Sequence, residues 1–130
     1  DDGRFLITLK GVCRFKIKKE LGENGFYRRI NPDFSDFKSD LTCNNPRINR
    51  DGLLPLLKDY LKVKGIEINI ADFINIEDRF LIPTLCMINP FDFREKQALL
   101  EIRDINEMAD VIISLMEMEL ISTTSAPTKH

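Results

Sequence analysis

The chain has very little of the side-chain chemistry on which most enzymes depend. Its only histidine is His130, the last residue, which leaves no histidine for a catalytic triad or a metal site within the chain. The sequence contains neither a Gly-x-x-x-x-Gly-Lys-Ser/Thr phosphate loop nor a Gly-x-Ser-x-Gly nucleophile turn. Carboxylates are abundant, but their positions are typical of helix caps and solvated helix faces. We therefore predict no enzyme activity and no catalytic, cofactor-binding or metal-binding residue.

Long hydrophobic runs and paired cysteines are also missing. No stretch of 18 apolar residues occurs, so we predict no membrane-spanning segment. The three cysteines, Cys13, Cys43 and Cys86, are far apart, and no Cys-x-x-Cys motif is present. This usage argues against a disulfide framework and predicts a reducing cytoplasmic location. The apolar neighbours of Cys13 and Cys86 predict that both are small core residues.

The charges of the chain are nearly balanced. Its 130 residues include 19 basic and 21 acidic ones, for a net charge of -2. This balance provides no general attraction to nucleic acid or to an anionic membrane. A hydrophobic fraction of 43% in a chain of this length is sufficient for a folded core.

The amino-terminal part has the two-residue period of strands. Apolar residues alternate with other residues over 4–10 and again over 13–20, and a third run covers 26–34. This period predicts three half-buried strands, with Pro32 ending the third strand or confining it to a sheet edge. The basic residues from Arg14 to Lys19 are then interpreted as the solvated side of a strand.

The period changes to that of a helix at about residue 49. Asn49 is a suitable cap for a helix that runs to Lys64, Gly65 is a suitable stop, and Pro55 should kink the helix or shift its start. The apolar stripe predicted to face the core is Leu53, Leu54, Leu57, Tyr60 and Leu61.

Further helices follow this first one. Residues 67–75 are ambiguous between loop and a short helical turn, and a helix with an interior proline is expected over 76–88. Asp92 with Glu95, and Asp104 with Glu107, have the spacing of capping boxes that open helices over 93–102 and 105–121. The core stripe predicted for the last helix is Ile105, Met108, Ala109, Ile112, Leu115 and Met116.

Two stretches together resemble one protein family. Residues 1–17, DDGRFLITLKGVCRFKI, resemble the Gly-Arg-hydrophobic and Leu-x-Gly-x-x-Arg-Phe-x-Ile hairpin of the LON substrate-binding domain. That domain is the amino-terminal domain of ATP-dependent protease La and also exists as a stand-alone bacterial protein. Residues 89–120, with Pro-Phe and Glu-Lys-Gln-x-Leu-Leu-Glu, resemble the helical ending of the stand-alone members.

The resemblance implies an α+β fold. We expect a partial PUA-like sheet of about three strands over residues 4–34, followed by a bundle of four or five helices over about 49–121. The expected division is a β portion over 1–45, a helical subdomain over 46–121 and a flexible tail over 122–130. Because PUA-like barrels of the family begin before the equivalent of Asp1, the chain is expected to be the carboxy-terminal portion of such a domain.

The resemblance also implies a function. A LON-type domain is expected to bind unfolded or tagged polypeptide segments for delivery to a protease or chaperone. No peptidase dyad or ATPase motif is present in the sequence, so catalysis would come from another chain. The polypeptide-contacting residues stay unassigned, because the motif residues Gly11, Arg14 and Phe15 are interpreted as structural. Leu99 and Leu100 are expected to pack while Lys96 and Gln97 are exposed.

Two alternatives stay open. One is a structural or dimerisation module without ligand, in which the strand edge near residues 4–10 recruits a second copy. The other, which the acidic balance disfavours, is an RNA-binding PUA-like domain. Its phosphate contacts would be Arg14, Lys16, Lys18, Arg28 and Arg29.

Overall fold

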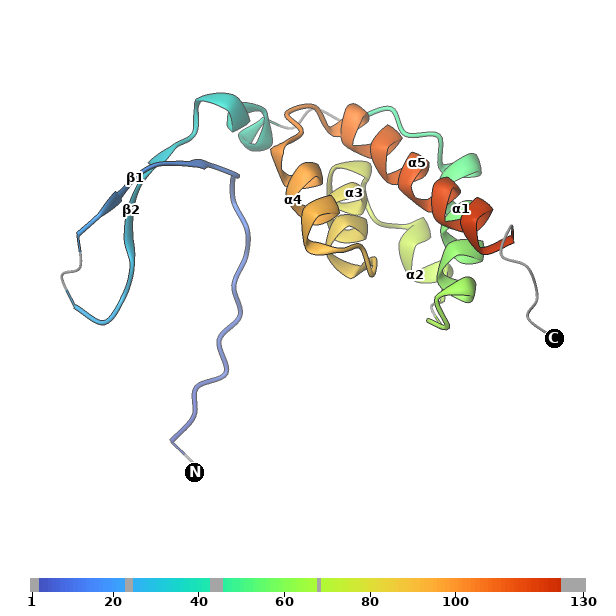
Figure 1. Cartoon of the computed structure of the whole chain (residues 1–130), viewed down its shortest axis with the longest axis horizontal. Helices are drawn as coiled ribbons and strands as arrows, with labels where there is room; N and C mark the ends of the chain where they lie inside the picture. The colour runs from blue at the N-terminus through green and yellow to red at the C-terminus, as the bar shows by residue number, and fades with distance from the viewer. Residues whose placement is uncertain (1–2, 23–24, 43–45, 68, 125–130) are drawn as a thin grey trace. The chain divides into compact units, whose positions relative to one another are not determined.

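The computed structural model describes residues 3–22, 25–42, 46–67 and 69–124 (Figure 1). The chain divides into two compact units, residues 1–43 and residues 44–130. The first unit contains a two-stranded antiparallel sheet and the second contains α-helices, so the predicted α+β class is confirmed.

The sheet of the first unit is a bulged hairpin. Strand β1 (Lys16–Leu21) pairs with β2 (Arg29–Asp33), and Leu21 lies opposite Arg29. The register shifts between Ile17 and Lys19, which leaves one extra residue in β1, as in a β-bulge. Pro32 lies opposite Ile17 in a sheet of two strands, where each strand is an edge, so its predicted edge position is confirmed.

Two predictions for this region are wrong. Residues 4–10 form no strand, and Figure 1 shows them as an extended run outside the two-stranded sheet. Every residue of β1 is exposed, so β1 is not half-buried. The alternating pattern was correct about extended backbone, but pairing and burial depend on a partner that lies elsewhere in sequence.

The element that closes the first unit was not predicted. Helix η1 is a 3₁₀ helix over Ser35–Leu41, and it buries the ring of Phe37. The Asp33 carboxylate accepts a hydrogen bond from the Ser35 backbone N–H at 2.9 Å, which starts the turn directly after β2.

The second unit begins with the predicted capped helix. Helix α1 (Arg50–Val63) starts where Asn49 accepts a hydrogen bond from the Gly52 N–H at 3.2 Å. It ends before Gly65, whose φ of +70° is the left-handed conformation that glycine adopts at little cost. Pro55 lies inside α1 and has not shifted its start.

The remaining helices follow closely. They are α2 (Ala71–Ile74), α3 (Asp78–Ile88), α4 (Phe93–Glu101) and α5 (Ile105–Thr124). The capping box of Asp92 and Glu95 is fully formed, and Asp104 accepts from the backbone N–H groups of Asn106 and Glu107. Helix α5 continues three residues beyond its predicted end. Within the described ranges, no helix is long and apolar enough to cross a membrane.

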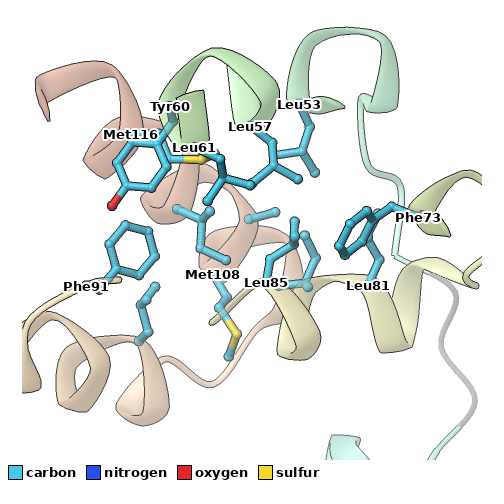
Figure 2. Packing of buried hydrophobic residues seen from close by; sticks show 14 residues of the cluster. Leu53, Leu57, Tyr60, Leu61, Phe73, Leu81, Leu85, Phe91, Met108 and Met116 are labelled. Atoms are coloured by element: carbon cyan, nitrogen blue, oxygen red, sulfur yellow. The ribbon is translucent and has the colours of Figure 1, made fainter. Parts of the chain in front are cut away.

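One hydrophobic core holds this helical unit together (Figure 2). The predicted stripes of α1 and α5 supply most of it, and the rings of Tyr60 and Phe91 pack at 5.9 Å between centroids. Leu99 is buried as predicted, but Leu100 is 52% exposed, because the nine-residue α4 buries only Leu99. Cys13 and Cys86 are half-buried rather than core residues.

The same unit contains one buried polar side chain that the apolar pattern did not indicate. Asn89 follows α3 and is 0% exposed. Neither its side-chain oxygen nor its side-chain nitrogen has a hydrogen-bond partner within the described part of the chain. An unsatisfied buried amide is destabilising, so Asn89 opposes the folding of an otherwise apolar interior.

Candidate functional site

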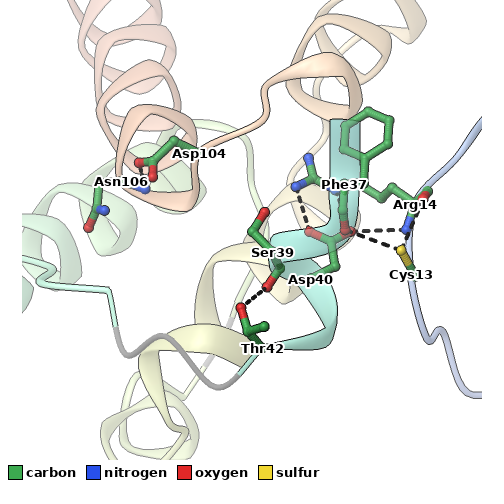
Figure 3. A network of polar contacts seen from close by, with 8 residues as sticks. All are labelled: Cys13, Arg14, Phe37, Ser39, Asp40, Thr42, Asp104 and Asn106. Atoms are coloured by element: carbon green, nitrogen blue, oxygen red, sulfur yellow. Dashed lines mark hydrogen bonds and ion pairs between the residues drawn. The ribbon is translucent and has the colours of Figure 1, made fainter. Parts of the chain in front are cut away.

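The first unit is held together by a guanidinium–carboxylate fork (Figure 3). The Nε and Nη2 atoms of Arg14 donate to the two oxygens of Asp40 at 2.9 and 2.8 Å. The backbone N–H of Arg14 also donates to Asp40, and the guanidinium lies 4.7 Å from the centre of the Phe37 ring. The backbone N–H and the guanidinium of Arg14 therefore both attach the chain just before β1 to η1.

Cys13 contributes to the same attachment. Its thiol lies 3.3 Å from the carbonyl oxygen of Phe37 and donates a weak hydrogen bond to it. Loss of contact with solvent and the charge of Asp40 raise the pKa of the Cys13 thiol. The thiol is therefore protonated at neutral pH and is no activated nucleophile.

Three of the five residues predicted as phosphate contacts already have acidic partners. Arg14 pairs with Asp40, Lys16 with Asp36 at 2.5 Å, and Arg28 with Glu20 at 2.6 Å. The Arg28 hydrogen bond and charge lower the pKa of Glu20. The structure therefore does not bring the five predicted residues together as one free basic patch.

The most exposed feature of the first unit is apolar. We define the apolar segment as residues 5–12, which precede the Cys13–Arg14 attachment. Its large side chains are almost fully in solvent, with Leu6 102% exposed and Phe5 90%. The other large apolar members are Ile7, Leu9 and Val12. Contiguous exposure of large apolar side chains is unusual for a protein surface.

The hairpin also exposes apolar side chains. Phe26 and Tyr27, which lead into β2, are 111% and 68% exposed. Ile17 is exposed on β1, and the exposed rings of Phe15 and Phe34 contact each other edge to face at 5.9 Å. The only buried large apolar side chain described in this unit is that of Phe37.

Sequence reasoning indicated the strand edge near residues 4–10 as a possible contact for a second copy, but it did not predict that the apolar side chains there are exposed. Phe5, Ile7 and Leu9 were interpreted as the buried face of a strand. The available signal was Leu6, an apolar residue on the opposite face of the same alternation, which also carries Arg4, Thr8 and Lys10. A half-buried strand with one solvated face would have a polar residue there.

No catalytic or metal constellation accompanies this surface in the part of the chain that the structure describes. There, no group of three or more histidine, cysteine, aspartate or glutamate side chains is placed to hold a metal ion. The described surface consists of exposed apolar side chains and of extended backbone that belongs to no strand.

Comparison with known proteins identifies one family. The family model of the ATP-dependent protease La (LON) substrate-binding domain matches residues 1–118. Searches of the curated proteins and of the solved structures each found no match.

Proposed function

The chain belongs to the LON substrate-binding domain family, and from that premise we propose that its apolar segment binds extended segments of unfolded or tagged polypeptides. The observation that carries this proposal is the run of large apolar side chains in solvent over residues 5–12. In this role the domain recognises the polypeptide and does not cleave it. Cleavage would be carried out by a separate protease to which the bound polypeptide is passed. A cytoplasmic location belongs to the same proposal.

Two kinds of contact support this function. Exposed apolar side chains of the segment can bury apolar side chains of an unfolded chain, which a folded protein keeps inside. The extended backbone of residues 4–10, which has no strand partner among the described residues, offers N–H and C=O groups to an incoming strand. An unfolded polypeptide provides both apolar side chains and free backbone hydrogen-bonding groups.

The hairpin gives this segment a fixed end. The Arg14–Asp40 fork and the Cys13 contact lie directly after the apolar segment, so its last residue is held by η1. We retain the expectation that β1 and β2 belong to a PUA-like sheet, to which a bound strand would add. A dimer through residues 4–10 would use the same groups and therefore compete with polypeptide binding.

A pair of matched variants tests the proposal. The segment variant replaces four residues of the apolar segment with serine: Phe5, Leu6, Ile7 and Leu9. The control variant replaces four exposed apolar residues of the helical unit with serine: Phe80, Met87, Phe93 and Leu100. Affinity for a fluorescent, denatured model protein is measured by anisotropy, with the folded form of that protein as reference.

We expect the segment variant to lose at least about tenfold in affinity, because four partly buried apolar contacts are removed. The control variant should bind as the original chain does. Equal loss in both variants, or equal binding of the folded and denatured protein, contradicts the proposal. A dimer that ignores the denatured protein would favour the dimerisation module instead.

A further inference from the structure

The surface that surrounds the apolar segment has a charge that the whole chain does not have. Residues 3–31 contain eight basic residues and two acidic ones, a net charge of +6, while the whole first unit, residues 1–43, has nine basic and seven acidic residues and the whole chain has a net charge of -2. The segments with the most exposed apolar side chains are thus also the most basic ones.

Several of these cations are available to a ligand. Lys10 lies inside the apolar segment, Lys18 lies at the β-bulge, and Lys19 and Arg29 lie on the hairpin. All four are exposed, and no ion pair joins any of them to another described residue. The charge of Lys18 helps to lower the pKa of Asp33, so Lys18 is partly compensated, whereas Arg14, Lys16 and Arg28 each have an ion-pair partner.

On the hairpin, cationic and apolar side chains lie on the same face. Lys19 lies opposite Asn31, and Leu21 lies opposite Arg29. Because cross-strand partners share a face and residues two apart do too, Lys19, Leu21 and Arg29 occupy one face of the hairpin. In the extended run, Lys10 lies on the side of Leu6 and Thr8, opposite its neighbour Leu9.

We propose, building on the polypeptide-binding function above, that the preferred substrate is an extended segment in which acidic residues alternate with apolar ones. Apolar side chains of such a segment contact residues 5–12, and its carboxylates lie near Lys10, Lys18 and Lys19. A segment with lysine or arginine at the same positions is repelled. Charge thus selects among the many apolar segments that unfolded proteins expose.

The test uses three peptides of twelve residues with identical apolar residues at alternate positions. The intervening positions are all glutamate, all glutamine or all lysine. The binders are the complete chain, a variant with Lys10, Lys18 and Lys19 changed to glutamine, and a control with Lys38, Lys58 and Lys62 changed to glutamine. The control also loses three positive charges, but from η1 and α1.

We expect the glutamate peptide to bind about tenfold more tightly than the glutamine peptide at low salt, since three surface charge pairs each contribute modestly. The lysine peptide should bind most weakly. The preference should fall below about twofold in the Lys10/Lys18/Lys19 variant, persist in the control, and weaken with added salt.

Three results would overturn the inference, and they are distinguishable. Equal binding of the glutamate and glutamine peptides removes the charge preference but leaves the proposed function standing. Binding of none of the three peptides removes both. An oligouridine that binds as tightly as the glutamate peptide and displaces it would show general polyanion binding, with no selection of a polypeptide.

Discussion

The two units of this chain are stabilised by different means. The helical unit buries fourteen residues in one continuous hydrophobic cluster. The first unit buries only the ring of Phe37 among its described large apolar side chains, and it is held by the Arg14–Asp40 fork, two further ion pairs and a bulged hairpin. Apolar burial provides most of the free energy of folding, so the helical unit is the stable part.

The difference explains where binding can occur. The helical unit also exposes large apolar side chains such as Met87 and Phe93, but they lie on helices whose backbone groups are already hydrogen-bonded within the helix. The first unit has its apolar side chains in solvent and its backbone partly unpaired, which lowers its own stability but provides binding surface. Under the proposed function, stability and recognition therefore belong to different parts of one chain.

The largest effect should come from the core of the helical unit. Leu57 is 0% exposed, so Leu57→Ala should lower the free energy of unfolding of this unit by about 2–5 kcal/mol. Thermal unfolding followed by far-ultraviolet circular dichroism measures the change. The matched control is Leu100→Ala on exposed α4 surface, and an equal loss there would contradict the assignment of the core.

A smaller effect is expected from the fork in the first unit. Arg14→Ala removes charged hydrogen bonds to Asp40 and the contact with Phe37, so it should destabilise this unit by about 1–3 kcal/mol. Amide hydrogen exchange of β1 and β2 measures the loss. Lys38→Ala is the control, and unchanged exchange in Arg14→Ala would show that the fork is dispensable.

Replacing the buried amide should act in the opposite direction. Asn89→Leu keeps the branching and the number of side-chain heavy atoms and removes two polar atoms that have no partner among the described residues, so it should raise stability by about 1 kcal/mol. Asn89→Asp places a charge at the same buried position and should lower stability. Denaturant unfolding of both variants gives the two signs, and stabilisation by Asn89→Asp would contradict this interpretation of the site.

Acid should weaken the first unit through Asp40. Burial alone would raise the pKa of Asp40, but the hydrogen bonds and charge of Arg14 outweigh it and hold the pKa below its usual value. A carboxyl group with a lowered pKa stabilises the fold above its unfolded pKa of about 4 and loses that contribution as the pH falls through the folded value. Nuclear magnetic resonance titration of the Asp40 carboxyl carbon should show this, and a midpoint above 4 would contradict it.

The helical unit was predictable because its signals are local. The Asn49 cap, the Gly65 stop and the Asp92–Glu95 box each act within a few residues, and the apolar stripes repeat along one helix. Asn89 was the exception, since nothing in its own sequence neighbourhood indicates complete burial.

The first unit was less predictable because its structure depends on distant partners. Alternation over residues 4–10 indicates extended backbone, but a strand also requires a neighbouring strand. The extra residue in β1 depends on strand pairing, and the start of η1 at Ser35 depends on a turn contact with Asp33, so neither follows from a sequence period. The residue types of the candidate site were visible in the sequence, whereas their exposure was not.

The most direct test of this division between the units is amide hydrogen exchange of the complete chain, with and without a saturating denatured polypeptide. We predict that bound polypeptide slows exchange in residues 4–12 and along β1, and leaves α1 to α5 unchanged. New protection confined to α3 and α4, with residues 4–12 exchanging as before, would contradict the claim that the first unit is the binding surface.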